Sequence, residues 1–102
     1  MTSDASPAVL VDAGEGRCTV AGDLTLATSE SLWRQLRDSG LMHGTRTVDL
    51  GQVRESDSAG LALLIAWRAG CLAGGGDLHV TSLPDRLAAL ARLTDANAIL
   101  SG

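Results

Sequence analysis

The chain has 102 residues, 45% of them hydrophobic and 20% charged, which is the size and composition of one globular domain. Its net charge is −4, and its eight basic residues are arginines that stand singly along the sequence, which argues against a clustered basic face for nucleic acid. Trp33 and Trp67 are the only aromatic residues, which excludes a stacking platform for single strands.

Apolar segments and cysteines point to a protein that stays in the cytoplasm. The longest apolar run, Leu61–Trp67, is far shorter than the roughly 20 residues needed to cross a bilayer, so we expect no membrane insertion. Asp4 stands where a secretory signal would be basic. Cys18 and Cys71 lack the CxxC spacing of metal and redox sites and fit buried thiols. We therefore expect neither a metal nor a cofactor.

The first part of the chain predicts a hairpin and then a helix. Residues 8–24 contain two short β-rich runs around a Gly-Glu-Gly turn, which is typical of a β-hairpin. Leu32 and Leu36 stand at helical spacing between Ser/Thr residues and a glycine. They predict an amphipathic helix over about 28–39.

The second part alternates strands with helices. Asp57 is a natural N-cap for the apolar segment that follows it, and glycines end that segment. Pro84 stands in the first turn of the last helical segment. The expected elements are a strand over 46–53, a loop over 54–57, a helix over 58–72, a strand over 77–81, a helix over 82–93 and a short strand or helical turn over 96–100.

This order predicts an α/β fold with a mixed β-sheet. The initial hairpin is antiparallel, and the helices between later strands imply crossovers and parallel pairing. We expect the helices to lie largely on one side of the sheet. Residues 1–7 are interpreted as a flexible lead and residues 8–102 as a single domain.

No catalytic motif is convincing. The segment Ser56–Gly60, "SDSAG", has serine where the GxSxG nucleophile turn needs glycine, and His43 and His79 are distant in sequence. The glycines of Ala73–Asp77 lack the Lys-Ser/Thr of a phosphate loop and follow a helix rather than precede one. We predict a protein that is not an enzyme and has no catalytic residues.

Ser58 marks the junction between a polar segment and the apolar run. One interpretation is that Asp57, or Ser58 itself, caps the first amides of the helix. The other is that Ser58 is a modification or contact site, because a helix start favours an added phosphate. Asp57 and Glu55 would oppose that phosphate by repulsion.

The helix that follows is apolar on more than one face. At 100° per residue, one stripe holds Leu61, Leu64, Ile65 and Leu72 with Arg68, and the other holds Leu63, Ala66, Trp67, Gly70 and Cys71. A helix on a sheet needs one apolar face, so the second is covered by neighbouring helices, by another protein, or by both.

The segment "TVDLGQVRESDSAGLALL" closely resembles the signature of the STAS domain, a family named for sulfate transporters and anti-sigma factor antagonists. In that signature a strand ending in Asp-Leu leads to Asp-Ser-x-Gly-Leu at a helix start, here Asp57 to Leu61. "GDLTLATSESL", residues 22–32, resembles an earlier segment of the family, and the element order is similar. The resemblance extends from about Ala8 to Leu100 and implies a STAS-like fold.

Two branches of the family give two functional expectations. "DSAGLALL" before Trp67 and "LPDRLAALARL" over Leu83–Leu93 resemble the MlaB-type STAS subunit of the lipid-asymmetry ABC transporter. That resemblance implies a non-enzymatic accessory subunit that binds the cytoplasmic ATPase of a phospholipid-transporting ABC complex, supports its assembly and activity, and reaches the inner membrane through that partner. The anti-sigma factor antagonist branch implies instead that a partner serine kinase phosphorylates Ser58.

In both branches the resemblance implies that Ser58 is a phosphorylation-like or partner-contact residue. The partner-binding surface implied around it consists of Arg54, Glu55, Ser56, Asp57, Ala59, Gly60 and Leu61.

Overall fold

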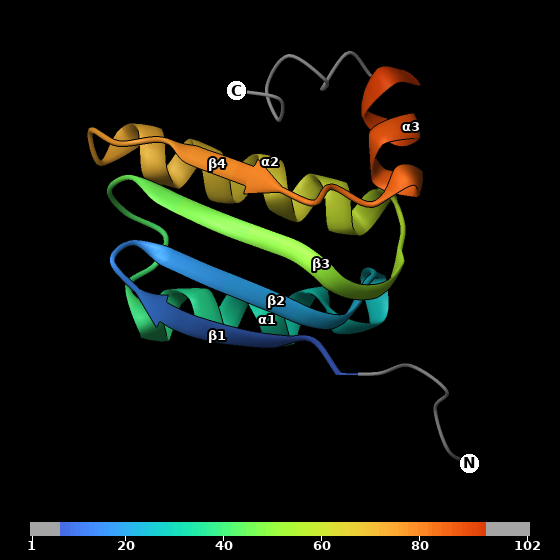
Figure 1. Ribbon diagram of the computed structural model, residues 1–102, viewed down its shortest axis with the longest axis horizontal. Helices are drawn as coiled ribbons and strands as arrows, with labels where there is room; N and C mark the ends of the chain where they lie inside the picture. The colour runs from blue at the N-terminus through green and yellow to red at the C-terminus, as the bar shows by residue number, and fades with distance from the viewer. Residues whose placement is uncertain (1–6, 94–102) are drawn as a thin grey trace.

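The computed structural model describes residues 7–93 and shows four strands and three helices in the order β1-β2-α1-β3-α2-β4-α3 (Figure 1). The strands are β1 Val9–Gly14, β2 Arg17–Leu24, β3 Arg46–Ser56 and β4 Leu78–Thr81. The helices are α1 Leu26–Ser39, α2 Ser58–Ala73 and α3 Asp85–Leu93. The predicted element at 96–100 lies outside the described residues. Within them, no helix is long and apolar enough to cross a membrane.

The sheet is mixed, as the sequence predicted. Its strand order is β1-β2-β3-β4, with β1 antiparallel to β2 and the other two neighbouring pairs parallel. Figure 1 shows α1 and α2 side by side on one face of this sheet, with α3 beside one end of α2. The prediction that the helices lie largely on one side is therefore confirmed, and the opposite face of the sheet carries no helix among the described residues.

The predicted loop over 54–57 is wrong, because β3 continues to Ser56. Glu55 pairs with Asp23 and Ser56 pairs with Leu24 of β2. Two register shifts along this pair each give β3 one extra residue, as in a β-bulge. The segment looks like a loop in the sequence because bulges and exposed side chains replace the simple alternation of a half-buried strand.

The helix starts also differ slightly from the prediction. Helix α1 begins two residues earlier than expected, because Thr28 lies inside its first turn and its hydroxyl oxygen accepts from the Thr25 amide at 3.1 Å. The α1 C-cap is Gly40, whose φ of 75° is the left-handed conformation that glycine adopts at helix ends. Helix α3 begins at Asp85, directly after Pro84, whose carbonyl accepts from the Ala88 amide.

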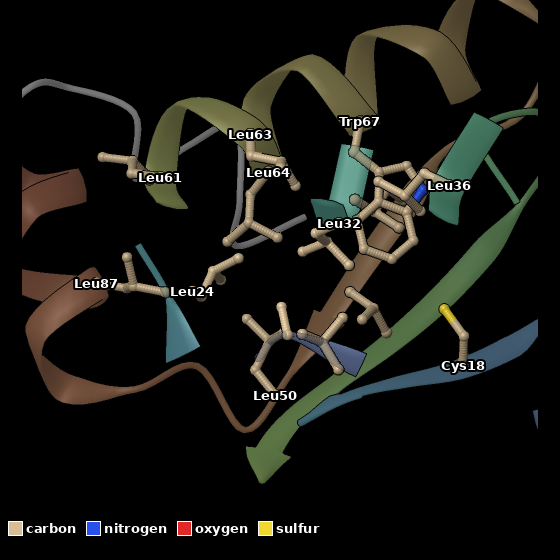
Figure 2. Packing of buried hydrophobic residues seen from close by; sticks show 14 of the residues in the cluster. Cys18, Leu24, Leu32, Leu36, Leu50, Leu61, Leu63, Leu64, Trp67 and Leu87 are labelled. Atoms are coloured by element: carbon tan, nitrogen blue, oxygen red, sulfur yellow. The ribbon is translucent and has the colours of Figure 1, made fainter. Parts of the chain in front are cut away.

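The core combines both predicted stripes of α2, so neither stripe alone faces the sheet. Trp67, which is fully buried, donates from its indole Nε1 to the Leu41 carbonyl at 2.8 Å. Leu72 and Ala66, one from each predicted stripe, are exposed instead. Figure 2 shows the packing of α2 residues against Leu24 and Leu50 from the strands, Leu32 and Leu36 from α1, and Leu87 from α3. The buried α2 residues are Gly60, Leu61, Leu63, Leu64, Trp67 and Cys71.

Because Gly60 has no side chain, the backbone of α2 can lie directly against the backbone at the end of β2. A Cβ atom at this position would overlap the Leu24 carbonyl oxygen and lie 2.9 Å from the Leu24 Cγ. Only a residue without a side chain therefore fits at this point of the fold. The contact fixes where the first turn of α2 lies relative to the sheet.

Candidate functional site

The candidate site lies where β2 and β3 end side by side and each strand passes into a helix. Leu24 is the last residue of β2, and it is paired with Ser56, the last residue of β3. The Asp57 amide donates to the Leu24 carbonyl at 3.3 Å, which holds the two strand ends together. As a result, the N-terminal ends of α1 and α2 are neighbours, and both present their first amides at this end of the sheet.

Asp57 joins the two helix starts through one carboxylate. Its Oδ1 accepts from the amides of Ala59 at 2.9 Å and Gly60 at 3.1 Å, in the first turn of α2. Its Oδ2 accepts from the amide of Leu26, the first residue of α1, at 3.1 Å. A carboxylate at a helix N-terminus is also favoured by the helix dipole. Asp57 is therefore the N-cap of α2 and a tether for α1.

This geometry decides the question of which residue caps α2. The capping acceptor is the Asp57 side chain, so the Ser58 hydroxyl is not required for that role. Ser58 is the first residue of α2, and it is exposed. A serine in this position has a hydroxyl that a partner protein or a modifying enzyme can reach.

An apolar groove runs between α1 and α2, beginning one residue after Ser58. Its volume is about 420 Å³. Ala62 and Ala66 are exposed on the α2 side, and Trp33 is half-buried on the α1 side. Leu26, at the start of α1, is 74% exposed. The groove is lined by Ser29, Glu30, Trp33, Ala59, Ala62, Leu63 and Ala66.

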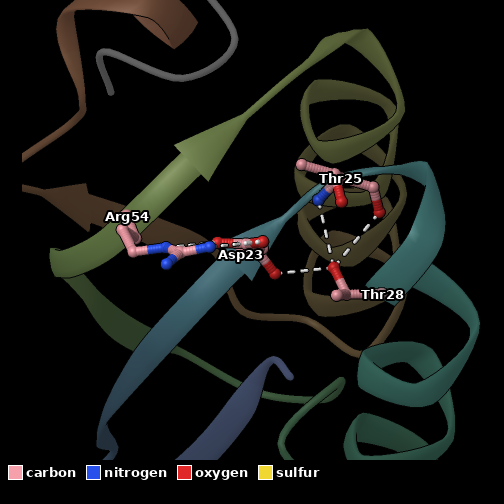
Figure 3. Close-up of polar contacts among 4 residues, drawn as sticks. All are labelled: Asp23, Thr25, Thr28 and Arg54. Atoms are coloured by element: carbon pink, nitrogen blue, oxygen red, sulfur yellow. Dashed lines mark hydrogen bonds and ion pairs between the residues drawn. The ribbon is translucent and has the colours of Figure 1, made fainter. Parts of the chain in front are cut away.

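An ion pair between Asp23 and Arg54 connects the ends of β2 and β3 (Figure 3). The Arg54 Nε donates to the Asp23 Oδ1 at 3.2 Å, and a guanidinium NH₂ group donates to the Oδ2 at 3.4 Å. The Asp23 side chain is only 5% exposed, whereas the Arg54 side chain is 56% exposed. The Asp23 carbonyl also accepts from the Thr28 hydroxyl at 2.6 Å, which links β2 to the first turn of α1. A buried carboxylate needs such a partner, so Arg54 supports this end of the sheet while its side chain stays partly accessible.

The residues predicted as a partner surface divide into accessible and buried groups. Arg54, Glu55 and Ser58 are exposed, and Asp57 and Ala59 are partly buried. The structure buries Ser56, Gly60 and Leu61, which corrects their place in the predicted surface, because strand pairing and core packing cover them. These three residues lie beneath the exposed residues of the site and support them.

Sequence reasoning did not assign the α1 side of the groove to the site. Trp33 was recognisable as a large apolar residue in an amphipathic helix, and Ala66 as part of a second apolar stripe on the following helix. No sequence pattern showed that the two would face each other, because that depends on how α1 and α2 pack together.

The two histidines lie at the other end of β3 from Ser58. His43 precedes β3, and its carbonyl accepts from the Arg46 side chain at the first residue of that strand. His79 is paired with Thr47, the second residue of β3. Ser58 lies two residues beyond the end of this eleven-residue strand, about 30 Å from its first residues at the usual rise per residue. Neither histidine can act as a general base for Ser58 in this fold.

Comparisons with known proteins agree with the fold and with the motif. A family model described as "Mlab, STAS domain" matches residues 8–101. A crystal structure of a chain described as an anti-sigma factor antagonist from Thermotoga maritima aligns with a TM-score of 0.69 at 16% identity, over 93% of this chain and 82% of that one. At this identity the likeness shows a shared fold. Among curated proteins, no sequence match was found.

Proposed function

Because the chain belongs to the MlaB-type STAS domain family, we propose that it is a non-enzymatic accessory subunit of a phospholipid-transporting ABC complex. In this proposal it binds the cytoplasmic ATPase subunit, supports assembly and activity of the transporter, and reaches the inner membrane through that partner. One observation carries the proposal: Asp57 caps α2 and thereby leaves Ser58 exposed next to an uncovered apolar groove.

The groove suits an amphipathic helix of the partner. Ala59, Ala62 and Ala66 lie on one side of α2 at helical spacing, and their small side chains allow another helix to approach closely. Glu30 lines the groove and is already paired with Arg34 on the same helix at 3.1 Å, so the groove offers the partner mainly apolar contacts. The partner would thus present an apolar stripe to the groove.

The alternative function is that of an anti-sigma factor antagonist controlled by phosphorylation of Ser58. The likeness to a chain described as such an antagonist favours it, as does the exposure of Ser58. A phosphate on Ser58 would bring a charge of about −1.5 to −2 close to the Asp57 carboxylate. Phosphorylation would then make this helix start more negative and release an acidic or apolar partner surface.

Ser58→Asp tests the contact role of the site. We expect this variant to recover much less ATPase subunit than the wild type in a pull-down, because it adds a second carboxylate beside Asp57 at the edge of the groove. The fold should be preserved, because Asp is well accepted at the start of a helix. Ser58→Ala is the matched control and should bind like the wild type. Equal recovery with Ser58→Asp and with the wild type would contradict the docking site.

Mass spectrometry of the protein purified from its own host separates the two functions. An ATPase and a permease that co-purify with an unmodified Ser58 would support the transporter function. A co-purifying serine kinase, together with phosphate on the peptide that contains Ser58, would support the antagonist function instead.

A further inference from the structure

The outer edge of β1 carries backbone groups that no strand pairs among the described residues. Strand β1 is the first strand of the sheet and has β2 on one side only. Successive residues of a strand direct their N–H and C=O groups to alternate sides. The groups of Ala8, Leu10 and Asp12 therefore point away from β2. Such an edge is a template for pairing with another chain.

The side chain of Gln35 occupies this edge. Its Oε1 accepts from the Leu10 amide at 2.9 Å, and its Nε2 donates to the Ala8 carbonyl at 2.8 Å. One residue of a parallel strand would make the same two contacts, because it donates to one residue and accepts from the residue two further along. A third bond, from Nε2 to the Ser31 hydroxyl at 3.3 Å, holds the amide in place from within α1.

The side chains of β1 would suit pairing with a second copy of the same strand. Val9 and Val11 are 46% and 50% exposed, and both belong to the sheet face opposite α1 and α2. In an antiparallel pair centred on Leu10, Val9 of each copy would face Val11 of the other, and Asp12 would face Ala8. Apolar side chains would thus meet across the two-fold axis, while the carboxylates would not oppose each other.

We propose that Gln35 blocks the β1 edge and prevents two copies of the chain from joining their sheets through β1. The amide takes two of the groups that a second strand would need, the Ala8 carbonyl and the Leu10 N–H, and so opposes the pairing that the exposed valines favour. This role concerns the flank of α1 opposite the groove and is independent of the proposed function.

Gln35→Ala tests this proposal in the full-length chain. We expect self-association at least about tenfold tighter than in the wild type, measured by sedimentation across a range of protein concentrations, because the bonds of the amide no longer compete. Gln52→Ala, which removes an exposed glutamine from β3, is the matched control and should sediment like the wild type.

A second variant identifies the edge that pairs. Gln35→Ala combined with Val9→Lys and Val11→Lys should return to a monomer, because lysines on an edge strand oppose pairing. The proposal is overturned if Gln35→Ala sediments as the wild type does, which would leave Gln35 as a purely structural tether. Association that persists with the two lysines would also overturn it, because another surface would then be responsible.

Discussion

The two flanks of α1, one towards α2 and one towards β1, differ in what they leave exposed. Towards α2, the helix leaves an apolar groove uncovered, with Trp33 on one side and Ala62 on the other. Towards β1, it places the Gln35 amide on backbone groups that would otherwise be unpaired. In the proposed function the first flank would offer a surface to a partner, whereas in the proposed role of Gln35 the second would remove one.

The reactivity of Cys18 would show whether the β1 flank is closed. Burial, and to a smaller extent the nearby charge of Asp12, raises the pKa of this thiol from 9.0 to about 11. At pH 8 the reactive thiolate should therefore be about 100-fold less abundant than in an ordinary cysteine, and iodoacetamide should react correspondingly slowly.

Peptide mapping by mass spectrometry distinguishes Cys18 from Cys71 in this experiment. The matched control is the same chain in denaturant, where Cys18 should react at the rate of a free thiol. A native rate equal to the denatured rate would show that β1 opens readily, and the contrast between the two flanks would be lost.

Substitutions of Asp57 should weaken the packing of the two helix starts beside the groove and leave the β1 flank unchanged. Asp57→Ala removes the cap of α2 and the tether to Leu26, so we expect a loss of about 2 kcal/mol in the free energy of unfolding, the upper end of the range for N-caps. Asp57→Asn keeps one carboxamide oxygen for the α2 amides but turns an NH₂ group towards the Leu26 amide. It should therefore cost less, about 1 kcal/mol.

Urea denaturation followed by tryptophan fluorescence, to which the buried Trp67 contributes, measures both losses. Equal stability of Asp57→Ala and the wild type would mean that the bonds of Asp57 do not hold the two helix starts. A loss for Asp57→Asn as large as that for Asp57→Ala would indicate that the tether to α1, rather than the α2 cap, carries the stabilisation.

Local patterns in the sequence were sufficient to predict the element order and the mixed sheet, and they named Asp57 as a candidate for the α2 cap beside Ser58. These features depend on hydrophobic period, glycine positions and neighbours one to four residues apart. The segment over 54–56 was mispredicted, because its polar residues belong to a bulged strand whose pairing partner lies about thirty residues earlier. Local polarity does not distinguish such a strand from a loop.

The features that define both flanks come from contacts between residues that are far apart in the sequence. Asp57 reaches Leu26 and Gln35 reaches Leu10, across separations of 31 and 25 residues. The division of the α2 side chains between core and groove likewise depends on α1 and α3 packing beside it. Helical periodicity alone therefore yielded two stripes, neither of which matches the buried face.

The central claim is that the α1–α2 groove binds the ATPase subunit, and titration calorimetry with the purified subunit tests it most directly. Ala62→Glu places a carboxylate inside the apolar groove and should weaken binding by at least about 100-fold, because the charge would be buried without a partner. Ala73→Glu, at the exposed end of α2 about 16 Å further along the helix, should bind like the wild type. Equal affinity of Ala62→Glu and the wild type would contradict the account.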